Sequence, residues 1–398
     1  MSPDLQRISE GCPREPDDAG RTAQRVVRVW SRGRLVGGVV CVCLLVVAGG
    51  LLGGRSLDSS IADDEHVVFF PTFGYLALDR ASWVIQIHGW ISEPELDSSL
   101  RNASLGILRR LSGLEKDEAE TATFKERARA FLVDNERGKR ISIRLGEKLH
   151  LAGISGPSGH FKGTIRLAPA EVKRLLDAQE MKDGWLRFEA ITRDEDSRRF
   201  AGRVQLIGHK GLSVISDIDD TIKISQVTDY RALLKNTFLR EFEPVPGMVE
   251  VYRSWAAAGA CFHYVSASPW QLYEPLSAFL QTVRFPAGTF HLKSFRLKDS
   301  TAMSLFASPE GLKRDSIESI LSAFPQRRFI LVGDSGEKDP EIYGALARDH
   351  PDQVALILIH DVTSEPADCQ RYQEAFAGIA KDRWTVFRHA EELDVRLP

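Results

Sequence analysis

The stretch "VISDIDDTIKIS", residues 214–225, places three carboxylates within four positions directly after a short β-branched run. The run predicts a strand, so Asp217, Asp219 and Asp220 stand at its carboxyl end. Carboxylates this close together repel one another, which raises their pKa values. On these residues alone, a solvated acidic turn is as good an interpretation as a functional site, and the rest of the chain has to decide between them.

Composition limits the alternatives. The chain has 398 residues, of which 43% are hydrophobic, so it is long enough for two or three packed domains. Its formal net charge of −3 gives no reason to expect a nucleic-acid partner. The cysteines show no CxxC pair and no spacing typical of a zinc site or a disulfide framework. They are Cys12, Cys41, Cys43, Cys261 and Cys369.

The N-terminal region contains a segment of membrane-spanning length. Residues 35–54, "LVGGVVCVCLLVVAGGLLGG", are 20 positions without a charge. Arg55 and several acidic residues follow the segment, whereas five arginines lie just before it, at positions 21, 25, 28, 32 and 34. By the positive-inside rule, residues 1–34 form a basic cytoplasmic lead and everything after the segment crosses the membrane. We therefore expect a membrane-anchored protein whose domains after residue 54 are extracytoplasmic.

Two alternatives to a retained anchor stay open. Small residues in "SSIA", residues 59–62, suit a signal-peptidase site, so the hydrophobic segment can also be a signal that is removed after export. A lead of 34 residues is long for a signal peptide, which favours the anchor. A misassigned start of the chain is the third interpretation.

Residues 63–210 predict a β-rich domain. Short alternating or aromatic-rich runs are separated by Gly, Pro, Asp and Ser, a pattern typical of a β-sandwich. These runs are 83–91, 141–146, 160–168, 185–192 and 200–208. Between the first two, residues 97–139 show helical spacing and predict a helical insertion. The sequon at Asn102 matters only if the domain is exported in a glycosylating host.

Residues 211–398 change to the pattern of an α/β fold. Apolar strands alternate with helical stretches, which predicts a parallel sheet flanked by helices. The strands are 212–216, 261–266, 328–334 and 354–360. Ligands of such sheets bind at the carboxyl ends of the strands. Asp217, Ser266 and Asp334 end or follow three of these strands, so we expect them on one edge.

Four elements agree in order and spacing with a known superfamily. They are the Asp217 to Thr221 motif (DxDxT), Ser266 at a strand end, Lys313 near the start of a helix, and the GDxxxxD run from Gly333 to Asp339. This ordered set resembles the haloacid dehalogenase superfamily, which implies a Rossmann-like parallel sheet.

Three sequence stretches narrow the resemblance from the superfamily to one family. "SDIDDTIK", "FHYVSASPWQLY" and "FPQRRFILVGDSGEKDPEIY" are similar to the catalytic domain of the Mg²⁺-dependent phosphatidate phosphatases associated in yeast with actin patches. The resemblance covers about 211–390 and implies hydrolysis of phosphatidate, or a related lipid phosphate, to diacylglycerol and phosphate. A phosphoprotein or general phosphomonoester phosphatase and a catalytically silent binding module stay open as alternatives.

Phosphoryl chemistry gives the acidic stretch a purpose. A phosphate monoester repels anionic nucleophiles, so its hydrolysis needs an attacking group shielded by a metal. Asp217 fits as the nucleophile that forms an aspartyl-phosphate. The metal ligands would be the carboxylates of Asp217 and Asp334 and the backbone carbonyl of Asp219, an all-oxygen set that suits Mg²⁺. Asp339 is either a direct ligand or a second-layer partner.

The remaining motif residues receive supporting roles. Asp219 would protonate the leaving alkoxide and later take a proton from the attacking water. Asp220 points away and is expected to be structural, while Thr221 would orient the loop. Ser266 would donate a hydrogen bond to a phosphoryl oxygen, and Lys313 would neutralise its charge.

Other residues near the motifs have plainer interpretations. His263 lies inside a strand and is expected to be a packed histidine. The basic group Lys293, Arg296 and Lys298 is either a solvated surface or a contact for lipid headgroups. Trp270 and Tyr273 either pack in the core or form an edge that contacts an acyl chain.

The spacing of the motifs bears on access to the site. Only 49 positions separate Asp217 from Ser266, and 47 separate Ser266 from Lys313. These intervals hold ordinary sheet elements but no large inserted cap. We therefore expect an open site that accepts a phosphate projecting from a membrane or protein surface.

Overall fold

The computed structural model describes residues 58–94, 106, 118, 121–178, 181–295 and 310–393. These residues belong to one compact unit that begins at Asp58. The predicted lead and hydrophobic segment, residues 1–54, lie outside the described residues, as do Asn102, Arg296 and Lys298. Within the described ranges no helix is both long enough and apolar enough to cross a membrane.

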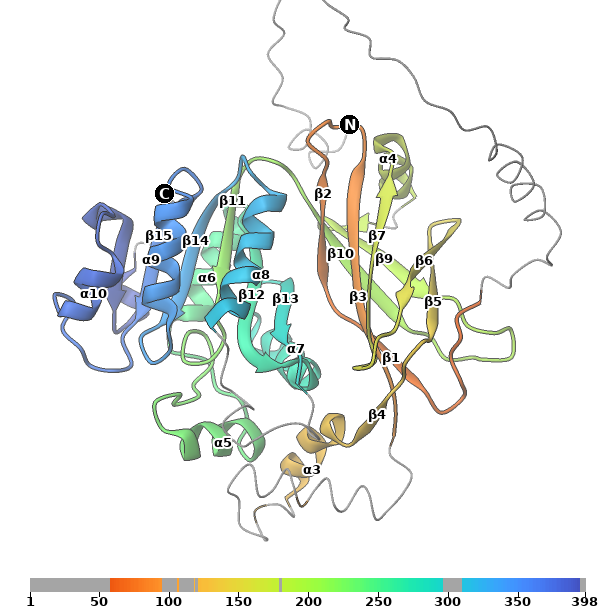
Figure 1. Cartoon of the computed structure of the whole chain (residues 1–398), viewed down its shortest axis with the longest axis horizontal. Helices are drawn as coiled ribbons and strands as arrows, with labels where there is room; N and C mark the ends of the chain where they lie inside the picture. The colour runs from red at the N-terminus through yellow and green to blue at the C-terminus, as the bar shows by residue number, and fades with distance from the viewer. Residues whose placement is uncertain are drawn as a thin grey trace, which may run out of the picture. The chain divides into compact units, whose positions relative to one another are not determined.

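Ten strands form the first sheet, which is the β-rich part of Figure 1. Their order is β1-β3-β2-β10-β9-β5-β6, with β4 and β7 also paired to β3 and β8 paired to β9. All pairs are antiparallel except β2 with β10. The strands are β1 (His66–Phe69), β2 (Thr72–Leu76), β3 (Trp83–Pro94), β4 (Val133–Asn135), β5 (Arg140–Leu145), β6 (Lys148–Ile154), β7 (His160–Leu167), β8 (Met181–Lys182), β9 (Trp185–Ala190) and β10 (Ala201–Ile207).

This sheet differs from the predicted sandwich of two sheets. Its strands share one continuous hydrogen-bonded network, because the 12-residue β3 pairs with β1 and β2 along one side and with β4 and β7 along the other. The sheet curls until β6 meets β7. A Cβ on Gly163 would lie 2.0 Å from the carbonyl oxygen of Ala152, so this approach requires glycine. Alternation of period two predicts strands but not how their sheet closes.

The helical insertion predicted at 97–139 is described only in part. Helix α3 (Ala122–Ala128) begins at Thr121, whose hydroxyl accepts a hydrogen bond from the backbone N–H of Phe124. The 3₁₀ helix η2 (Arg129–Phe131) follows directly, and β4 then returns the chain to the first sheet. Helix α4 (Pro169–Asp177) lies between β7 and β8.

Six parallel strands form the second sheet, in the order β13-β12-β11-β14-β15-β16. The predicted α/β class with a parallel sheet is therefore confirmed. The strands are β11 (Leu212–Ser216), β12 (Cys261–Pro269), β13 (Gly288–Lys293), β14 (Arg328–Asp334), β15 (Val354–His360) and β16 (Trp384–Phe387). The helices are α5 (Tyr230–Phe238), α6 (Met248–Ala257), α7 (Tyr273–Val283), α8 (Glu310–Ala323), α9 (Asp339–Asp349) and α10 (Gln370–Ala375), with short 3₁₀ turns η3 (Trp270–Leu272), η6 (Lys381–Arg383) and η7 (Ala390–Glu392).

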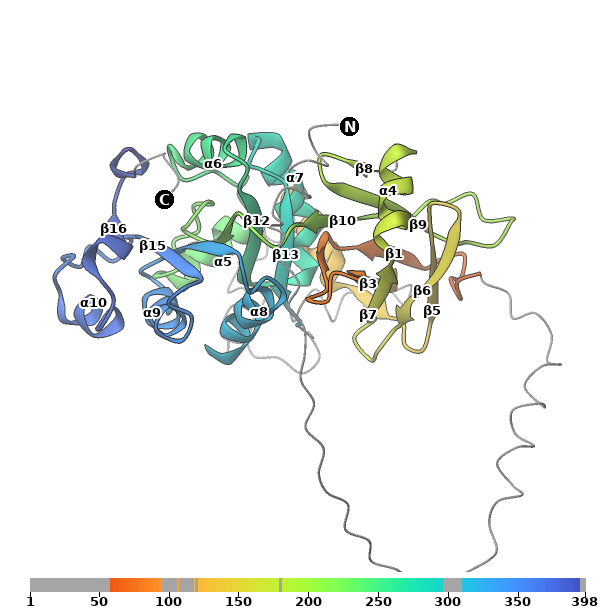
Figure 2. The same cartoon turned by 90° about the horizontal axis from the view of Figure 1, so that it is seen from above.

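Helices cover both faces of this second sheet. Val214 shares a core with α6 and α7, whereas the next residue, Ile215, shares a core with α8, α9 and α10. Figure 2 shows α6 and α7 on one side and α8 and α9 on the other. A strand buried on both faces must be apolar at successive positions, which explains the unbroken runs in β11, β14 and β15.

The two sheets pack together as one body. Phe70, after β1, stacks on Trp270 of the second part with ring centroids 4.1 Å apart. Phe73 of β2 packs against Phe324, after α8, at 5.2 Å. The backbone N–H of Phe290 in β13 also donates to the carbonyl of Pro71 at 3.1 Å. The first sheet is therefore held beside strand β13, at the edge of the parallel sheet.

His263 and Trp270 are both buried. Nδ1 of His263 lies 2.8 Å from Oγ1 of Thr289, and burial lowers the pKa of the imidazole well below its ordinary value. Trp270 is 5% exposed and packs between Phe70 and His88. The indole therefore belongs to the core that joins the two sheets, in addition to facing the cavity described below.

Candidate active site

The motif after β11 forms a tight turn fastened by Asp220. This residue has a φ of +54°, the left-handed region that few non-glycine residues adopt. Its carboxylate accepts hydrogen bonds from the backbone N–H groups of Ser225, Gln226 and Val227 at 2.6–2.8 Å. Such a bonding pattern holds the loop in place and leaves Asp220 turned toward the backbone, as expected of a structural residue.

Asp217, Asp334 and Asp339 form a buried acidic cluster at the carboxyl edge of the parallel sheet. Asp217 follows β11, Asp334 ends β14, and Asp339 begins α9. Each is at most 1% exposed, and each contributes a carboxylate oxygen within 4.8 Å of the others. Burial raises the pKa values of Asp217 and Asp334 well above the ordinary range, and the neighbouring carboxylates raise them further.

Lys313 enters this cluster from α8. Its ammonium lies 3.0 Å from Asp217 Oδ1 and 3.3 Å from Glu337 Oε2, and it also pairs with Asp339 Oδ1. Burial opposes the charge on Lys313, yet Asp217 and Asp339 raise the pKa of the ammonium well above its ordinary value. Lys313 thus pairs with three carboxylates, and Asp334 adds a fourth to the cluster, so the carboxylates outnumber the ammonium group.

The cluster fits a divalent cation. Among the described residues, Oδ2 of Asp217 and Oδ2 of Asp334 are buried acceptors without a hydrogen-bond partner. Buried acceptors normally have a hydrogen-bond partner. These two oxygens have none within the described part of the protein, so their lone pairs suit a bound cation. Both oxygens of Asp339 are in use, because Oδ1 pairs with Lys313 and Oδ2 accepts from the backbone N–H of Asp334 at 3.2 Å. Both carboxylate oxygens of Asp339 thus already have partners within the protein, unlike Oδ2 of Asp217 and of Asp334.

Asp219 points away from Lys313 and toward a separate set of partners. Its Oδ1 lies 2.7 Å from the ammonium of Lys223, and its Oδ2 accepts from the hydroxyls of Ser268 at 2.8 Å and Ser266 at 3.3 Å. Burial raises the pKa of Asp219, but Lys223 and the hydroxyl donors outweigh it, so the pKa is lowered. Without substrate, Asp219 is held as a carboxylate.

Two predicted residues have surroundings that the motif did not specify. Ser266 donates to Asp219 and accepts from the backbone N–H of Ser268 at 3.0 Å. The hydroxyl of Thr221 is fully buried and has no hydrogen-bond partner in the described part of the chain. Thr221 therefore lies inside the loop that it was predicted to orient.

Several residues of the site were not assigned a role from the sequence. Lys223 and Ser225 hold Asp219, Ser268 shares it with Ser266, and Glu337 contacts Lys313. Lys223 stands four positions after Asp219, and a turn brings such positions together. This spacing is the sequence feature that could have indicated their contact. The contact of Glu337 depends on the fold and has no comparable local signal.

A cavity of about 640 Å³ lies beside this site, between the two sheets. Ser266, Trp270, Lys293 and Lys313 line it from the catalytic side, and residues of β2, β3 and β7 line it from the first sheet. The predicted absence of an inserted cap thus does not leave the site bare, because the first sheet covers part of it. Figure 1 shows the two sheets on either side of this region.

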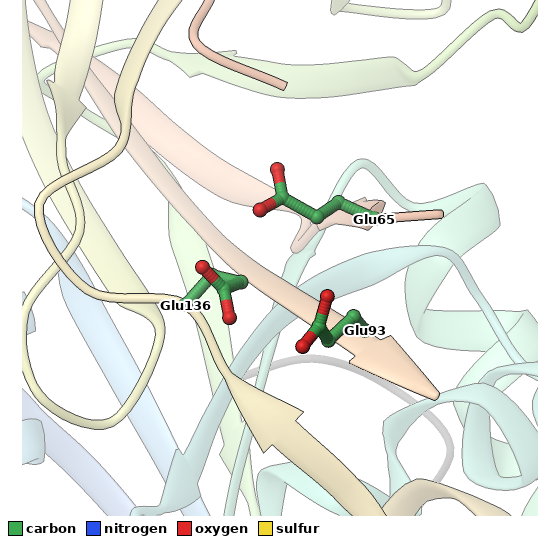
Figure 3. Close-up of side chains that lie close together, drawn as sticks. All are labelled: Glu65, Glu93 and Glu136. Atoms are coloured by element: carbon green, nitrogen blue, oxygen red, sulfur yellow. The ribbon is translucent and has the colours of Figure 1, made fainter. Parts of the chain in front are cut away.

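A second acidic group lies in the first sheet. Glu65, Glu93 and Glu136 place carboxylate oxygens within 4.8 Å of one another (Figure 3). Lys139 pairs with Glu65 and lies 3.4 Å from Glu136, and the backbone N–H of Ala62 donates to Glu65 at 2.7 Å. The protein itself thus satisfies the buried member of this group, in contrast to the acidic cluster beside Lys313.

Comparison with known proteins agrees with this geometry. Residues 212–361 match the family model described as "Phosphatidate phosphatase APP1, catalytic domain". This region is similar to the catalytic domain of the phosphatidate phosphatase APP1 family. The matched range contains the buried acidic cluster, Asp219, Ser266 and Lys313, and the resemblance of the motifs to phosphatidate phosphatases is confirmed.

Two relatives share this part of the chain. Phosphatidate phosphatase APP1 of Saccharomyces cerevisiae is 34% identical over 168 residues, which are 41% of this chain and 28% of that protein. An uncharacterised protein of Schizosaccharomyces pombe is 28% identical over 202 residues, 50% of this chain and 31% of that protein. The chain therefore spans about a third or less of the length of these relatives.

The excess of carboxylates over ammonium groups in the buried acidic cluster leads to a prediction about stability. A carboxylate whose pKa is raised in the folded state leaves the free energy of unfolding unchanged at pH values below its unfolded-state pKa. It lowers that free energy most at pH values above the raised pKa. In chelator, wild-type stability should therefore fall as pH rises from about 4. Asp334→Asn should raise the Tm at pH 7, by roughly 2–4 °C for each kcal/mol of repulsion relieved. Added Mg²⁺ should raise the Tm of the wild type only.

Thermal unfolding in EDTA and in MgCl₂ measures both effects. Asp352→Asn is the matched control, because Asp352 is exposed in the turn before β15. Equal stabilisation by Mg²⁺ of the wild type and Asp334→Asn would show that the cluster does not hold the metal.

Proposed function

We propose that the protein is a Mg²⁺-dependent phosphatidate phosphatase that releases diacylglycerol and phosphate through an aspartyl-phosphate. The observation that carries the proposal is the family match at 212–361, which contains a buried Asp217 within 3.0 Å of Lys313. The order of the motifs supports a haloacid dehalogenase type of parallel sheet. The choice of Mg²⁺ rests on the oxygen-only donors of Asp217 and Asp334, which are the donors that this hard cation prefers.

In the proposed reaction a carboxylate oxygen of Asp217 attacks phosphorus, and the bond from phosphorus to the glyceryl oxygen breaks. Lys313 neutralises charge on the transferred phosphoryl group. Bound Mg²⁺ would supply further positive charge, which keeps Asp217 ionised and reduces its repulsion by the substrate. Water then attacks the aspartyl-phosphate, so that phosphate leaves and Asp217 is restored.

Asp219 is the proposed proton carrier between these two steps. Once an anionic phosphoryl group lies beside it, Asp219 takes up a proton, gives that proton to the departing glyceryl oxygen, and later takes another from the attacking water. Lys223 lowers the pKa of Asp219, whereas an anionic phosphoryl group placed beside it acts in the opposite direction. Lys223, Ser225 and Ser268 fix the direction in which this carboxylate points.

Variants of the two motif carboxylates test the mechanism. Asp217→Asn should abolish turnover, at least a 10³-fold loss, because an amide does not attack phosphorus. Asp219→Asn should lose less on p-nitrophenyl phosphate than on phosphatidate, because a leaving group that is already a weak base needs little protonation. Steady-state kinetics on both substrates measures these losses. Substantial activity in Asp217→Asn would exclude Asp217 as the nucleophile.

The substrate is tested with the full chain in mixed micelles. Phosphatidate should have a much higher kcat/KM than glycerol 3-phosphate, which carries the same phosphoryl group without acyl chains. Each methylene removed from water contributes roughly 0.8 kcal/mol, so a few acyl contacts exceed the 1.4 kcal/mol or so that corresponds to tenfold. Equal efficiency on the two substrates would favour a general phosphomonoester phosphatase, and higher activity on phosphoproteins would favour the protein substrate. No activity on any of them would favour the binding module.

We also propose that residues 35–54 anchor the protein and that the catalytic domain is extracytoplasmic. The support is the arginine-rich lead before the uncharged segment and the acidic residues after it. A reporter that is active only outside the cytoplasm, fused after Arg55, should be active, and its cytoplasmic counterpart should be silent. The reverse pattern would refute this orientation. Loss of the N-terminal segment from the mature protein would favour export after signal cleavage.

A further inference from the structure

We propose that the cavity between the two sheets binds the glyceryl ester part of the substrate, and that Lys162 of the first sheet and Lys293 of the catalytic domain contact its oxygen atoms. This inference rests on the proposed function and adds the residues that recognise the lipid. It assigns the first sheet a direct part in substrate selection.

The cavity begins at the reacting groups. Lys313 and Ser266 line it, and both also contact the catalytic carboxylates, Lys313 through Asp217 and Ser266 through Asp219. A phosphoryl group held at Asp217 therefore has the cavity directly beside it. At about 640 Å³ the cavity has the size of ordinary small-ligand sites.

The strands of the first sheet present polar side chains to the cavity by simple alternation. In β7, Phe161 and Ile165 are buried in the core of that sheet, whereas Lys162 and Thr164 between them are exposed and line the cavity. Successive side chains of a strand point to opposite faces, so Lys162 cannot join the core without a shift of register. The same alternation in β3 places His88 on the cavity side.

The lining combines positive charge with apolar surface. Three lysines, Lys162, Lys293 and Lys313, stand against one carboxylate, Asp315, among the described residues of the cavity wall. The apolar part of the wall includes Trp270, Phe290 and Leu292. Such a wall suits a molecule that has ester and phosphate oxygens attached to hydrocarbon, which is the composition of a glyceryl ester phosphate.

The histidines at the cavity are neutral, so the lysines supply its positive charge. Burial lowers the pKa of His88 well below its ordinary value and lowers that of His291 to about 4, and the charge of Lys162 adds to both effects. Burial and the charge of Lys162 also lower the pKa of His160, which lies 3.1 Å from His88, to about 4. These imidazoles are neutral at pH 7, so Lys162 and Lys293 are the groups able to attract oxygen acceptors.

Lys162 allows a cleaner test than the aromatic wall. Replacing Trp270 by Ala would remove the contacts of the indole with Phe70 and His88, and truncating a buried tryptophan costs about 3–5 kcal/mol. Lys162 is exposed, so its substitution leaves both cores intact. Lys182 of β8 is a matched control, because it is an exposed lysine of the same sheet outside the cavity.

The experiment measures, in the full chain, the kcat/KM for dioctanoyl phosphatidate below its micelle-forming concentration and for p-nitrophenyl phosphate. The ratio of the two reports recognition of the glyceryl ester without a membrane surface. Lys162→Met should lower this ratio about tenfold, mainly through KM for the lipid, since it removes one charged hydrogen-bond donor. Lys162→Arg should keep most of the ratio, and Lys182→Met should leave it unchanged.

The outcomes separate the inference from the proposed function. An unchanged ratio in Lys162→Met, with active wild type, would overturn the inference alone. An equal fall in Lys182→Met would also overturn it, because the effect would then come from the overall charge of the sheet. Wild-type protein that hydrolyses p-nitrophenyl phosphate but not phosphatidate would overturn the proposed function, and the inference with it.

Discussion

The structure of the site depends on one electrostatic constraint, which is the burial of Asp217, Asp334 and Asp339 around a single ammonium group. Lys313 pairs with Asp217 and Asp339, while Asp334 is left with a buried oxygen that no described residue satisfies. Charges removed from water are costly unless they are paired, so the protein alone leaves this arrangement incomplete. The parallel sheet supplies the rigidity that holds the carboxylates together against their repulsion.

Much of the catalytic domain could be predicted from local sequence. Unbroken apolar runs identified the strands of the parallel sheet, and the rule that ligands bind at carboxyl ends placed Asp217 and Asp334 at one edge. Contacts set by the tertiary fold could not be predicted in the same way. The role of Ser266 toward a phosphoryl oxygen stays a prediction, and nothing in the sequence indicated that its hydroxyl also contacts Asp219. Such partners depend on the directions of side chains in a loop, and these directions do not follow the regular periodicity by which strands and helices are predicted.

The first sheet shows the same limit on a larger scale. Its strands follow from alternation, yet the closure of one curled sheet depends on the length of β3 and on the approach of β6 to β7 at Gly163. The motif spacing predicts that no large cap is inserted between Asp217 and Lys313. It carries no information about a domain that precedes the motifs in the chain and packs against them through Phe70 and Phe73.

This packing has a consequence for how the two parts evolve and act together. Inserted caps reach a catalytic edge through hinges within the domain, whereas here the covering wall is a sheet fixed by a shared aromatic core. Interdigitated cores resist gradual deformation, so the width of the cavity is set by side chains such as Trp270 rather than by a hinge. Under the proposed function, substrate selection can then change through the cavity-lining positions of β3 and β7 without altering the buried acidic cluster.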